Sequence, residues 1–175
     1  MEQETIIQNE QEYKDVEYAG FWRRFAAYII DGFIIAFIQQ IMVIPFLAIF
    51  GLSFISSSGL DFEELESSDP AALGYLVAII GAYFSLVILM IVLQWLYYSL
   101  MESSKYQGTL GKIALNIKVT NYQGQRITFL RATGRYFGKI LSGIIFMIGF
   151  IMAGITEKKQ ALHDLIAETL VVKKS

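Results

Sequence analysis

The sequence predicts an all-α integral membrane protein with two long transmembrane helices, a third short or re-entrant apolar segment, and a small cytoplasmic β-hairpin or strand element. Of its 175 residues, 55% are hydrophobic, and the mean hydropathy is +0.50. Ordinary soluble domains hold roughly 45–50% apolar residues with glycine included. Two apolar runs, over residues 21–50 and 72–101, exceed the ~20 residues that cross a bilayer. The length allows one membrane domain, residues 21–175, after a polar acidic tail over residues 1–20.

The first apolar run contains charged residues, whose insertion into a bilayer is energetically unfavourable. Arg23 and Arg24 stand at its start, and Asp31 lies inside it. An aspartate at the centre of a membrane helix costs roughly 2.5–3.5 kcal/mol on insertion scales. Arg24 and Asp31 are seven positions apart, which places them on one helix face, ~10.5 Å from each other. One arginine can serve to hold the helix end in the cytoplasm, but Asp31 calls for a function or a specific buried pairing.

The second span is separated from the first by an acidic loop. Pro45 is expected to end or kink the first span, and a loop is expected over residues 51–71. This loop contains no Lys or Arg, so by the positive-inside rule it faces away from the cytoplasm. In the second span, Gln94 and Glu102 lie on one polar stripe. Glu102 is either an interfacial charge or a partner for Arg24.

Residues 103–135 carry the positive charge that marks a cytoplasmic segment. The basic residues are Lys105, Lys112, Lys118, Arg126, Arg131 and Arg135. Apolar residues alternate over 115–120 and again over 126–129, with a turn-forming NYQGQ between them, which predicts a short β-hairpin. The QGTLGK stretch at 107–112 lacks the spacing and the preceding strand of a phosphate-binding loop, so we do not expect nucleotide binding there.

The third apolar segment, residues 136–156, is at the short edge of what crosses a bilayer. If it crossed once, the lysines of the C-terminal tail would lie outside, against the positive-inside rule. A re-entrant hairpin would return the tail to the cytoplasm, where a short strand over residues 170–173 could pair with the predicted hairpin. We favour this arrangement, with both termini in the cytoplasm and the protein in the cell inner membrane.

Composition removes several classes of function. The chain has no cysteine and one histidine, which excludes thiolate and multi-histidine metal sites within one chain. The net charge of −2 gives no basic footprint for nucleic acid. No nucleophile–base pair or cofactor fingerprint is present, and the adjacent His163 and Asp164 would need further ligands to form a hydrolytic metal site. We expect neither an enzyme nor a bound cofactor.

Three segments resemble the RDD family of small membrane proteins, whose name refers to one arginine and two aspartates. They are FWRRFAAYIID at 21–31, ESSKYQGTLGKIALNIKV at 102–119 and ALHDLIAETLVV at 161–172, in the family's order. The resemblance implies that Arg24, Asp31 and Asp164 are the arginine and the two aspartates to which the family name refers. The adjacent Arg23 is an alternative candidate for the arginine. One departure is Glu168, which stands where the family often has glycine.

Some members of the family have been linked to sodium/proton exchange, and this leads to the first of two hypotheses, which is slightly favoured. The protein would exchange Na⁺ or a similar cation for H⁺, with Asp31 binding either ion and Asp164 supplying a second carboxylate. The supporting residues are Arg23, Gln94, Glu102, Thr109, Lys112 and His163. Among these, Gln94 or Thr109 would complete the ion's oxygen shell, or backbone carbonyls would do so. With so few membrane segments, the protein would need to form a homo-oligomer to build a pathway.

The second hypothesis is a membrane assembly or interaction module that transports nothing. Arg24, Asp31 and Asp164 would form a buried ion network that locks the first span to the cytoplasmic part of the chain. Removing one member of such a network leaves an uncompensated charge and costs about 3–5 kcal/mol. His163, with an unperturbed pKa of ~6.5, is either a pH sensor or a hydrogen-bonding residue that fixes its helix, and the second role is favoured.

Overall fold

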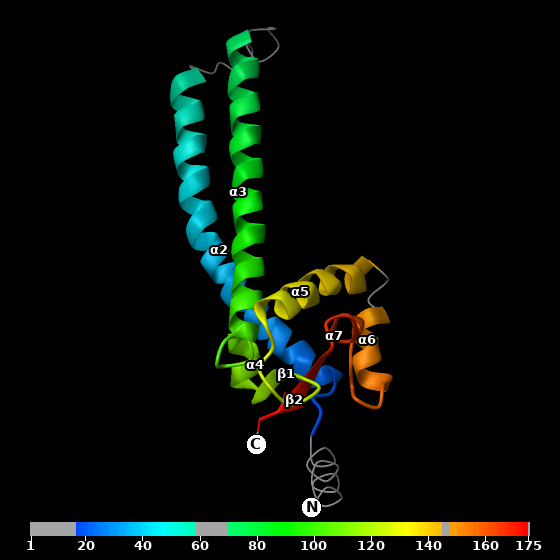
Figure 1. Ribbon diagram of the computed structural model, residues 1–175. Coiled ribbons are helices and arrows are strands. Elements are labelled where there is room, and N and C mark those ends of the chain that lie inside the picture. The colour runs from blue at the N-terminus through cyan, green and yellow to red at the C-terminus, as the bar shows by residue number, and fades with distance from the viewer. Residues whose placement is uncertain (1–16, 59–69, 145–147, 175) are drawn as a thin grey trace, which may run out of the picture. The chain divides into compact units, whose positions relative to one another are not determined.

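The computed structural model describes residues 17–58, 70–144 and 148–174, so the acidic tail up to residue 16 and most of the predicted acidic loop lie outside the described residues. The chain is mostly helical, which confirms the predicted fold class. The elements are α2 (Phe21–Ser58), α3 (Pro70–Ser103), α4 (Leu110–Ala114), β1 (Ile117–Asn121), α5 (Phe129–Ile144), α6 (Ile148–Ile155), α7 (Leu162–Ile166) and β2 (Thr169–Lys173) (Figure 1).

Helices α2 and α3 are both long and apolar enough to cross a membrane, which confirms the two predicted spans. The stretches that meet this requirement are Phe21–Ser53 and Val77–Ser103, with mean hydropathies of 2.4 and 2.5. Both helices are longer than predicted. Pro45 lies inside α2 without ending it, and residues 51–58, expected in the loop, continue the helix. Because unpaired backbone groups are expensive in an apolar medium, a helix that continues past a proline is preferred there to a loop.

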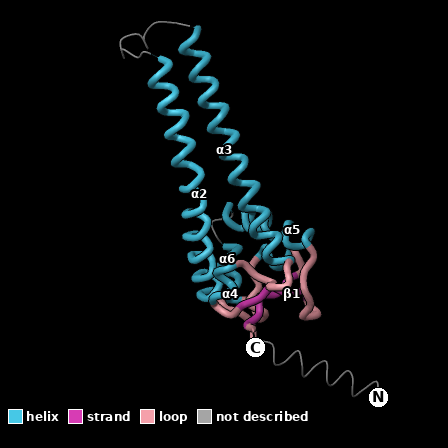
Figure 2. The backbone as a smooth tube through the Cα atoms, turned by 90° about the vertical axis from the view of Figure 1, so that its left-hand side faces the viewer, coloured by secondary structure: helices cyan, strands magenta, loops and turns pink. Residues whose placement is uncertain are grey.

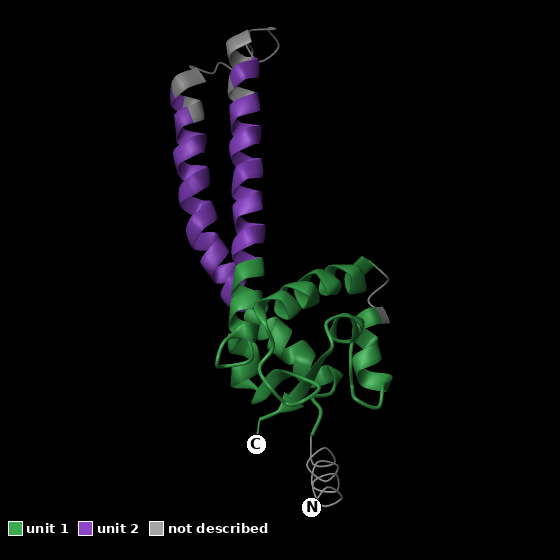
Figure 3. Cartoon of the chain, viewed as in Figure 1, with its two compact units in different colours: residues 1–32, 95–175 green, residues 33–94 purple. Residues whose placement is uncertain are grey.

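Two compact units make up the chain: residues 33–94, and residues 1–32 together with 95–175 (Figure 3). The described residues of the first unit are segments of α2 and α3. We call the described part of the second unit the cap. The cap holds the first turns of α2, the last turns of α3 and the elements from α4 to β2, and it contains every predicted site residue except Gln94.

A small antiparallel sheet ties the two ends of the described chain together (Figure 2). Strand β1 pairs with β2, with Val119 opposite Val171. Just before α2, Tyr18 forms a bridge with Val172, and Ala19 N donates to Val171 O at 2.9 Å. The core of the cap is formed by Ala19, Ala27, Ile117, Val119, Ile127, Ala132 and Val171. The start of the first span and the C-terminal strand therefore belong to one unit.

The second strand of the predicted hairpin, residues 126–129, does not form. Asn121 Oδ1 accepts hydrogen bonds from the backbone N–H groups of Gln123 at 3.0 Å and Gln125 at 2.8 Å. Asparagine side chains favour turns because they satisfy nearby backbone groups in this way. The chain then enters α5 at Phe129, and β1 takes the predicted C-terminal strand, β2, as its partner.

The third apolar segment is bent, and its first helix is polar on the inside. The axes of α5 and α6 differ by 98°. Arg135 and Ser142 of α5 are buried, whereas large apolar side chains on the other face of α5 are exposed, among them Leu130 and Ile144. An apolar outer face suits a helix that lies against lipid. In the sequence, Lys139 interrupts the start of the third apolar segment, and in the fold Lys139 and the neighbouring Arg135 face Glu102.

Candidate functional site

The second aspartate of the motif is the centre of a buried ion network. Asp164 is fully buried in the first turn of α7, and its Oδ2 accepts hydrogen bonds from Arg24 Nη1 and from Ala161 N. Its Oδ1 forms an ion pair with Arg135 Nη2 at 2.7 Å. Burial alone would raise the pKa of Asp164, but the Arg135 and Arg24 guanidiniums outweigh burial and hold the pKa well below its usual value.

Glu102, at the end of α3, is the second carboxylate of the ion network. It is 1% exposed, and its Oε1 accepts from Lys112 Nζ at 2.6 Å and from Lys139 Nζ at 3.3 Å. Its Oε2 lies 3.4 Å from Arg135 Nη1. The Nη2 atom of the same arginine forms the ion pair with Asp164. Arg135 therefore bridges the two carboxylates. The ion network, defined as Arg24, Glu102, Lys112, Arg135, Lys139 and Asp164, joins α2, α3, α4, α5 and α7.

Cations outnumber carboxylates in the ion network, and this excess of positive charge contributes to a lowered pKa of Lys112. Burial, together with the charges of Arg135 and Lys139, lowers the pKa of Lys112 to about 7, although Glu102 acts to raise it. A lysine that is desolvated beside other cations releases its proton more easily. Lys112 therefore holds its proton less firmly than an exposed lysine does.

The first aspartate is held in a different way, by neutral donors. Asp31 is 1% exposed, and its Oδ2 accepts from Thr109 Oγ1 at 2.5 Å. Its Oδ1 accepts from Gly111 N at 2.8 Å and from the Tyr97 hydroxyl at 3.0 Å. The Tyr97 hydroxyl in turn accepts from Leu110 N at 3.1 Å. We call this group, Asp31 with Tyr97, Thr109, Leu110 and Gly111, the carboxylate clasp, because it binds α2 to the start of α4.

Glycine at position 111 makes the carboxylate clasp possible. A Cβ atom added there would lie 2.2 Å from Ala27 O and 3.0 Å from Asp31 Cγ. These distances are shorter than any van der Waals contact, and one of the atoms is backbone, so only a residue without a side chain lets α4 approach α2 this closely. The TLGK stretch thus supplies a hydroxyl from Thr109, an N–H from Gly111 and an ammonium group from Lys112.

The charged residues that sequence spacing placed on one helix face do not pair with each other in the structure. Arg24 belongs to the ion network and Asp31 to the carboxylate clasp, so they do not pair with each other. Glu102, one of whose predicted roles was to pair with Arg24, instead binds Lys112, Lys139 and Arg135. Arg24 rather than Arg23 contacts Asp164. Gln94 lies in the unit of residues 33–94, outside the cap.

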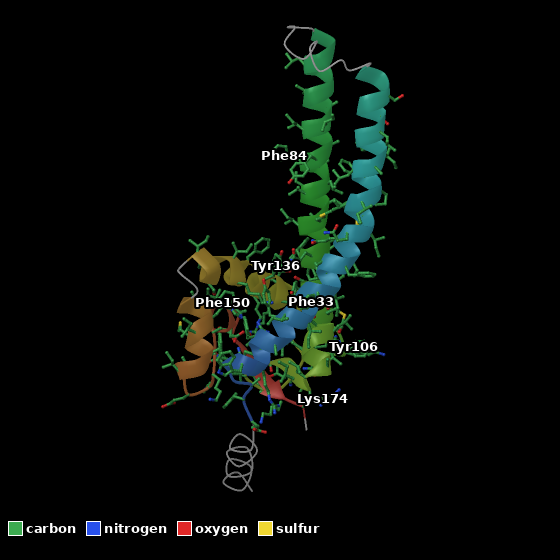
Figure 4. The ribbon with its side chains drawn as sticks, turned by 180° about the vertical axis from the view of Figure 1, so that it is seen from behind. Phe33, Phe84, Tyr106, Tyr136, Phe150 and Lys174 are labelled. Atoms are coloured by element: carbon green, nitrogen blue, oxygen red, sulfur yellow. The ribbon has the colours of Figure 1, made fainter. Side chains whose placement is uncertain are left out.

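His163 is buried next to Asp164 in α7. Its Nδ1 lies 3.5 Å from Ser142 Oγ and its Nε2 lies 3.5 Å from Asp164 Oδ1, while its ring packs 5.3 Å from the ring of Phe150, labelled on α6 in Figure 4. Burial, with added repulsion from Arg135 and other nearby cations, lowers the pKa of His163 to about 3 although Asp164 opposes the shift. A histidine that is neutral at physiological pH fits the favoured role of fixing its helix better than that of a pH sensor.

Sequence reasoning missed several residues that complete these clusters. Arg135 was counted only as a cytoplasmic charge and Lys139 only as a break in the third apolar segment, although the two are four positions apart on a helix whose remaining face is apolar. That spacing is the signal that both point to one side. Nothing in the sequence marks Tyr97 or the N–H of Gly111 as partners of a carboxylate. Across the part of the chain that the structure describes, no three His, Asp or Glu residues gather as a metal-binding group.

Comparisons with known proteins agree with the resemblance seen in the sequence. The sequence model of the RDD family matches residues 18–168. An uncharacterized protein of Bacillus subtilis (strain 168), YxaI, is 44% identical over 157 residues, which cover 89% of this chain and 97% of that protein. An uncharacterized membrane protein of the same strain, YteJ, is 30% identical over 161 residues, which cover 89% of this chain and 80% of that protein. No solved structure matches this chain.

Proposed function

The chain belongs to the RDD family, and we propose that it is a membrane assembly module that transports nothing. In this role the Arg–Asp–Asp residues lock the first span to the cap, and partner membrane proteins assemble on the rigid unit. One observation carries the proposal: each oxygen of Asp31, Glu102 and Asp164 already lies against a hydrogen-bond donor or a cation of the protein.

The surroundings of Asp31 are unsuited to a metal cation. Na⁺ is held by oxygen lone pairs, so an exchange site needs acceptors that converge on the carboxylate. Thr109, Gly111 and Tyr97 instead direct hydrogens at Asp31. A cation that displaced them would leave the buried donors of Thr109 and Gly111 unpaired, at about 1–3 kcal/mol each. This chemistry supports a structural clasp over an ion-coupling site.

The second span offers a surface for the partner. Gly74 and Ala78, four positions apart, are both exposed on α3. Small residues at this spacing let a second membrane helix approach closely. A second copy of the chain is the simplest occupant, and cross-linking from single cysteines at these positions would test it, since the chain has no cysteine of its own.

The cap faces the cytoplasm in this proposal, because the basic residues of the chain gather in it. A cysteine introduced at Lys105, which is exposed, should react with a membrane-impermeant maleimide only after the inner membrane is opened. Labelling in cells whose inner membrane is intact would place the cap outside and contradict this orientation.

Proton flux in reconstituted vesicles separates the two hypotheses. Wild-type protein and Asp31→Asn would be compared with a pH-sensitive dye after Na⁺, Li⁺ or K⁺ is added. We expect no cation-dependent proton movement from either protein. We also expect Asp31→Asn to lower the free energy of unfolding by about 1–2 kcal/mol, because the amide keeps only one acceptor oxygen for the carboxylate clasp.

Glu168→Gln is the matched control for this change of charge, because Glu168 is exposed and pairs with the surface residue Arg131. Its unfolding free energy should stay within about 0.5 kcal/mol of wild type. Dissipation of the proton gradient by wild type, lost in an Asp31→Asn protein of unchanged melting temperature, would favour the exchanger and contradict the assembly module.

A further inference from the structure

An open groove of about 620 Å³ lies in the cap, outside the ion network and the carboxylate clasp. It is lined by the chain entering α2, by α6 with the turn that follows it, and by the last residue of β2. Its charged lining residues are Glu17, Arg23, Lys159 and Lys173. The groove is therefore basic, although the whole chain carries a net charge of −2.

Two of these cations have no counter-ion in the described protein. Lys173 forms an ion pair with Glu17, so these charges offset each other. Among residues 17–58, 70–144 and 148–174, neither Arg23 nor Lys159 makes an ion pair. A groove with two uncompensated cations attracts an anion.

Lys159 is held in place by a tight turn rather than by a charged partner. Its φ is 47°, a left-handed conformation that side chains other than glycine rarely adopt. The turn is fixed by Thr156, whose carbonyl accepts from Lys159 N at 2.9 Å and whose hydroxyl accepts from Gln160 N at 2.7 Å. The stem of Lys159 lies over Gly20, where an added Cβ would be 3.7 Å from Lys159 Cδ. The ammonium group is thus presented at the groove by a defined backbone.

The mouth of the groove is apolar and lies at the end of a membrane span. Trp22 is 76% exposed and Ile155 is 80% exposed, and both line the groove. Trp22 and Arg23 stand in the first turn of the span Phe21–Ser53. Tryptophan and arginine at the end of a span lie at the level of the lipid headgroups. A ligand that reaches this position carries an anionic group beside an apolar chain.

We propose that the groove binds an anionic phospholipid from the leaflet on the side of the cap. The phosphate lies between Arg23 and Lys159, and an acyl chain runs along Trp22 and Ile155. This site goes beyond the assembly role and does not depend on it, because none of its residues belongs to the ion network or the carboxylate clasp. Bound lipid would set the depth at which the cap meets the membrane.

Fluorescence quenching tests the proposal on the full-length protein. The chain has two tryptophans, so Trp95→Phe leaves Trp22 as the only reporter. This protein, in neutral detergent, would be titrated with brominated phosphatidylglycerol, and separately with brominated phosphatidylcholine. We expect saturable quenching by phosphatidylglycerol at concentrations at least tenfold lower than those of phosphatidylcholine. Inorganic phosphate at the same concentrations should not compete, because it lacks the apolar chain.

A pair of double variants identifies the site. Arg23→Gln with Lys159→Asn removes the two free cations, and asparagine tolerates the left-handed φ at position 159. Lys105→Gln with Arg126→Gln removes two exposed cations that do not line the groove. The first pair should raise the midpoint of quenching by roughly tenfold or more, and the second by less than twofold. Melting temperatures, compared first, show whether each variant is folded, and the single variants Arg23→Gln and Lys159→Asn replace the first pair if it is not.

Three results would overturn the proposal. Equal midpoints for the two lipids would mean that the groove does not recognise the headgroup charge. Equal shifts in the two double variants would mean that only the overall charge of the cap matters. Competition by inorganic phosphate at the lipid's own concentration would assign the two cations to a free anion instead.

Discussion

The carboxylate clasp and the ion network bury carboxylates equally well but satisfy them with opposite chemistry. Asp31 accepts three hydrogen bonds from neutral groups, two side-chain hydroxyls and a backbone N–H. Asp164 and Glu102 are surrounded by arginines and lysines. Neutral donors fix position because they act only at short range, whereas charges act over longer distances and respond to pH. The clasp therefore sets the register between α2 and α4, and the ion network makes the cap sensitive to protonation.

The largest effect should come from Arg135→Met, which keeps an unbranched side chain but removes the charge that bridges Asp164 and Glu102. Breaking a buried network by removing one partner costs about 3–5 kcal/mol. Chemical denaturation in detergent should show this loss in the free energy of unfolding. Arg131→Met, one turn earlier in α5, removes only an exposed pair with Glu168 and should cost less than about 1 kcal/mol. Equal losses in the two variants would mean that the ion network adds nothing beyond a surface contact.

Gly111→Ala should have the next largest effect, and it acts on the carboxylate clasp. The added methyl group would meet the backbone of Ala27 and force α4 away from α2. Overpacking of this kind costs about 1–3 kcal/mol, and we expect the upper part of that range because a backbone atom must move. The loss should appear in the same denaturation experiment.

Gly134→Ala is the control for this substitution, because a Cβ at position 134 in α5 meets nothing within 4 Å. Alanine is the better helix former, so this variant should be as stable as wild type or up to about 1 kcal/mol more stable. If Gly111→Ala behaves like Gly134→Ala, the close approach that defines the clasp is not needed for stability.

The pH dependence separates the two regions with a smaller effect. The pKa of His163 falls from 6.5 to about 3 on folding, first because of burial, so the unfolded chain binds the extra proton between these values. The contribution of His163 to stability is therefore fully present above pH 6.5. It is lost as the pH is lowered toward 3, and the loss reaches about 2 kcal/mol at pH 5. The lowered pKa of Asp164 adds its loss only below its ordinary value of 3.8. The lowered pKa of Lys112 gives a slope of the same sign, but only above pH 7, so it does not interfere between pH 7 and pH 5.

His163→Gln should remove the slope between pH 7 and pH 5, and thermal melting in buffered detergent measures it. No change in that slope would mean that His163 is not buried in its neutral form. Asp31→Asn should leave the slope as it is in wild type, because the clasp contacts Asp31 through neutral groups.

The spans and the buried aspartates were predictable from the sequence, and their partners were not. Apolar length identifies a membrane helix, and a carboxylate within it must be satisfied by something. One partner of Asp31 is the backbone N–H of Gly111, 80 positions away, and a backbone N–H leaves no mark in a sequence. The other two are the hydroxyls of Tyr97 and Thr109, whose pairing with Asp31 depends on the fold. The pairing of the sheet was equally hard to predict, because β1 pairs with a strand that follows three further helices, while the nearer segment 126–129 showed the same alternation.

The inward charges of α5 were the most misleading feature. Arg135 was interpreted as an ordinary cytoplasmic charge and Lys139 as an interruption of the third apolar segment, because positive residues at a membrane are usually exposed. The fold instead turns them toward Glu102 and Asp164, which come from α3 and α7. Only the arrangement of five elements in space shows that these charges have carboxylates to meet.

Amide hydrogen exchange tests the central claim, that Asp31 is a structural clasp, most directly. In Asp31→Leu the backbone N–H of Gly111 loses its acceptor, and that of Leu110 loses a Tyr97 hydroxyl that Asp31 holds in place. We predict that these two amides exchange roughly a hundredfold faster than in wild type, while the amides of β1 and β2 keep their protection. Unchanged protection of Leu110 and Gly111 in a folded Asp31→Leu protein would contradict the clasp.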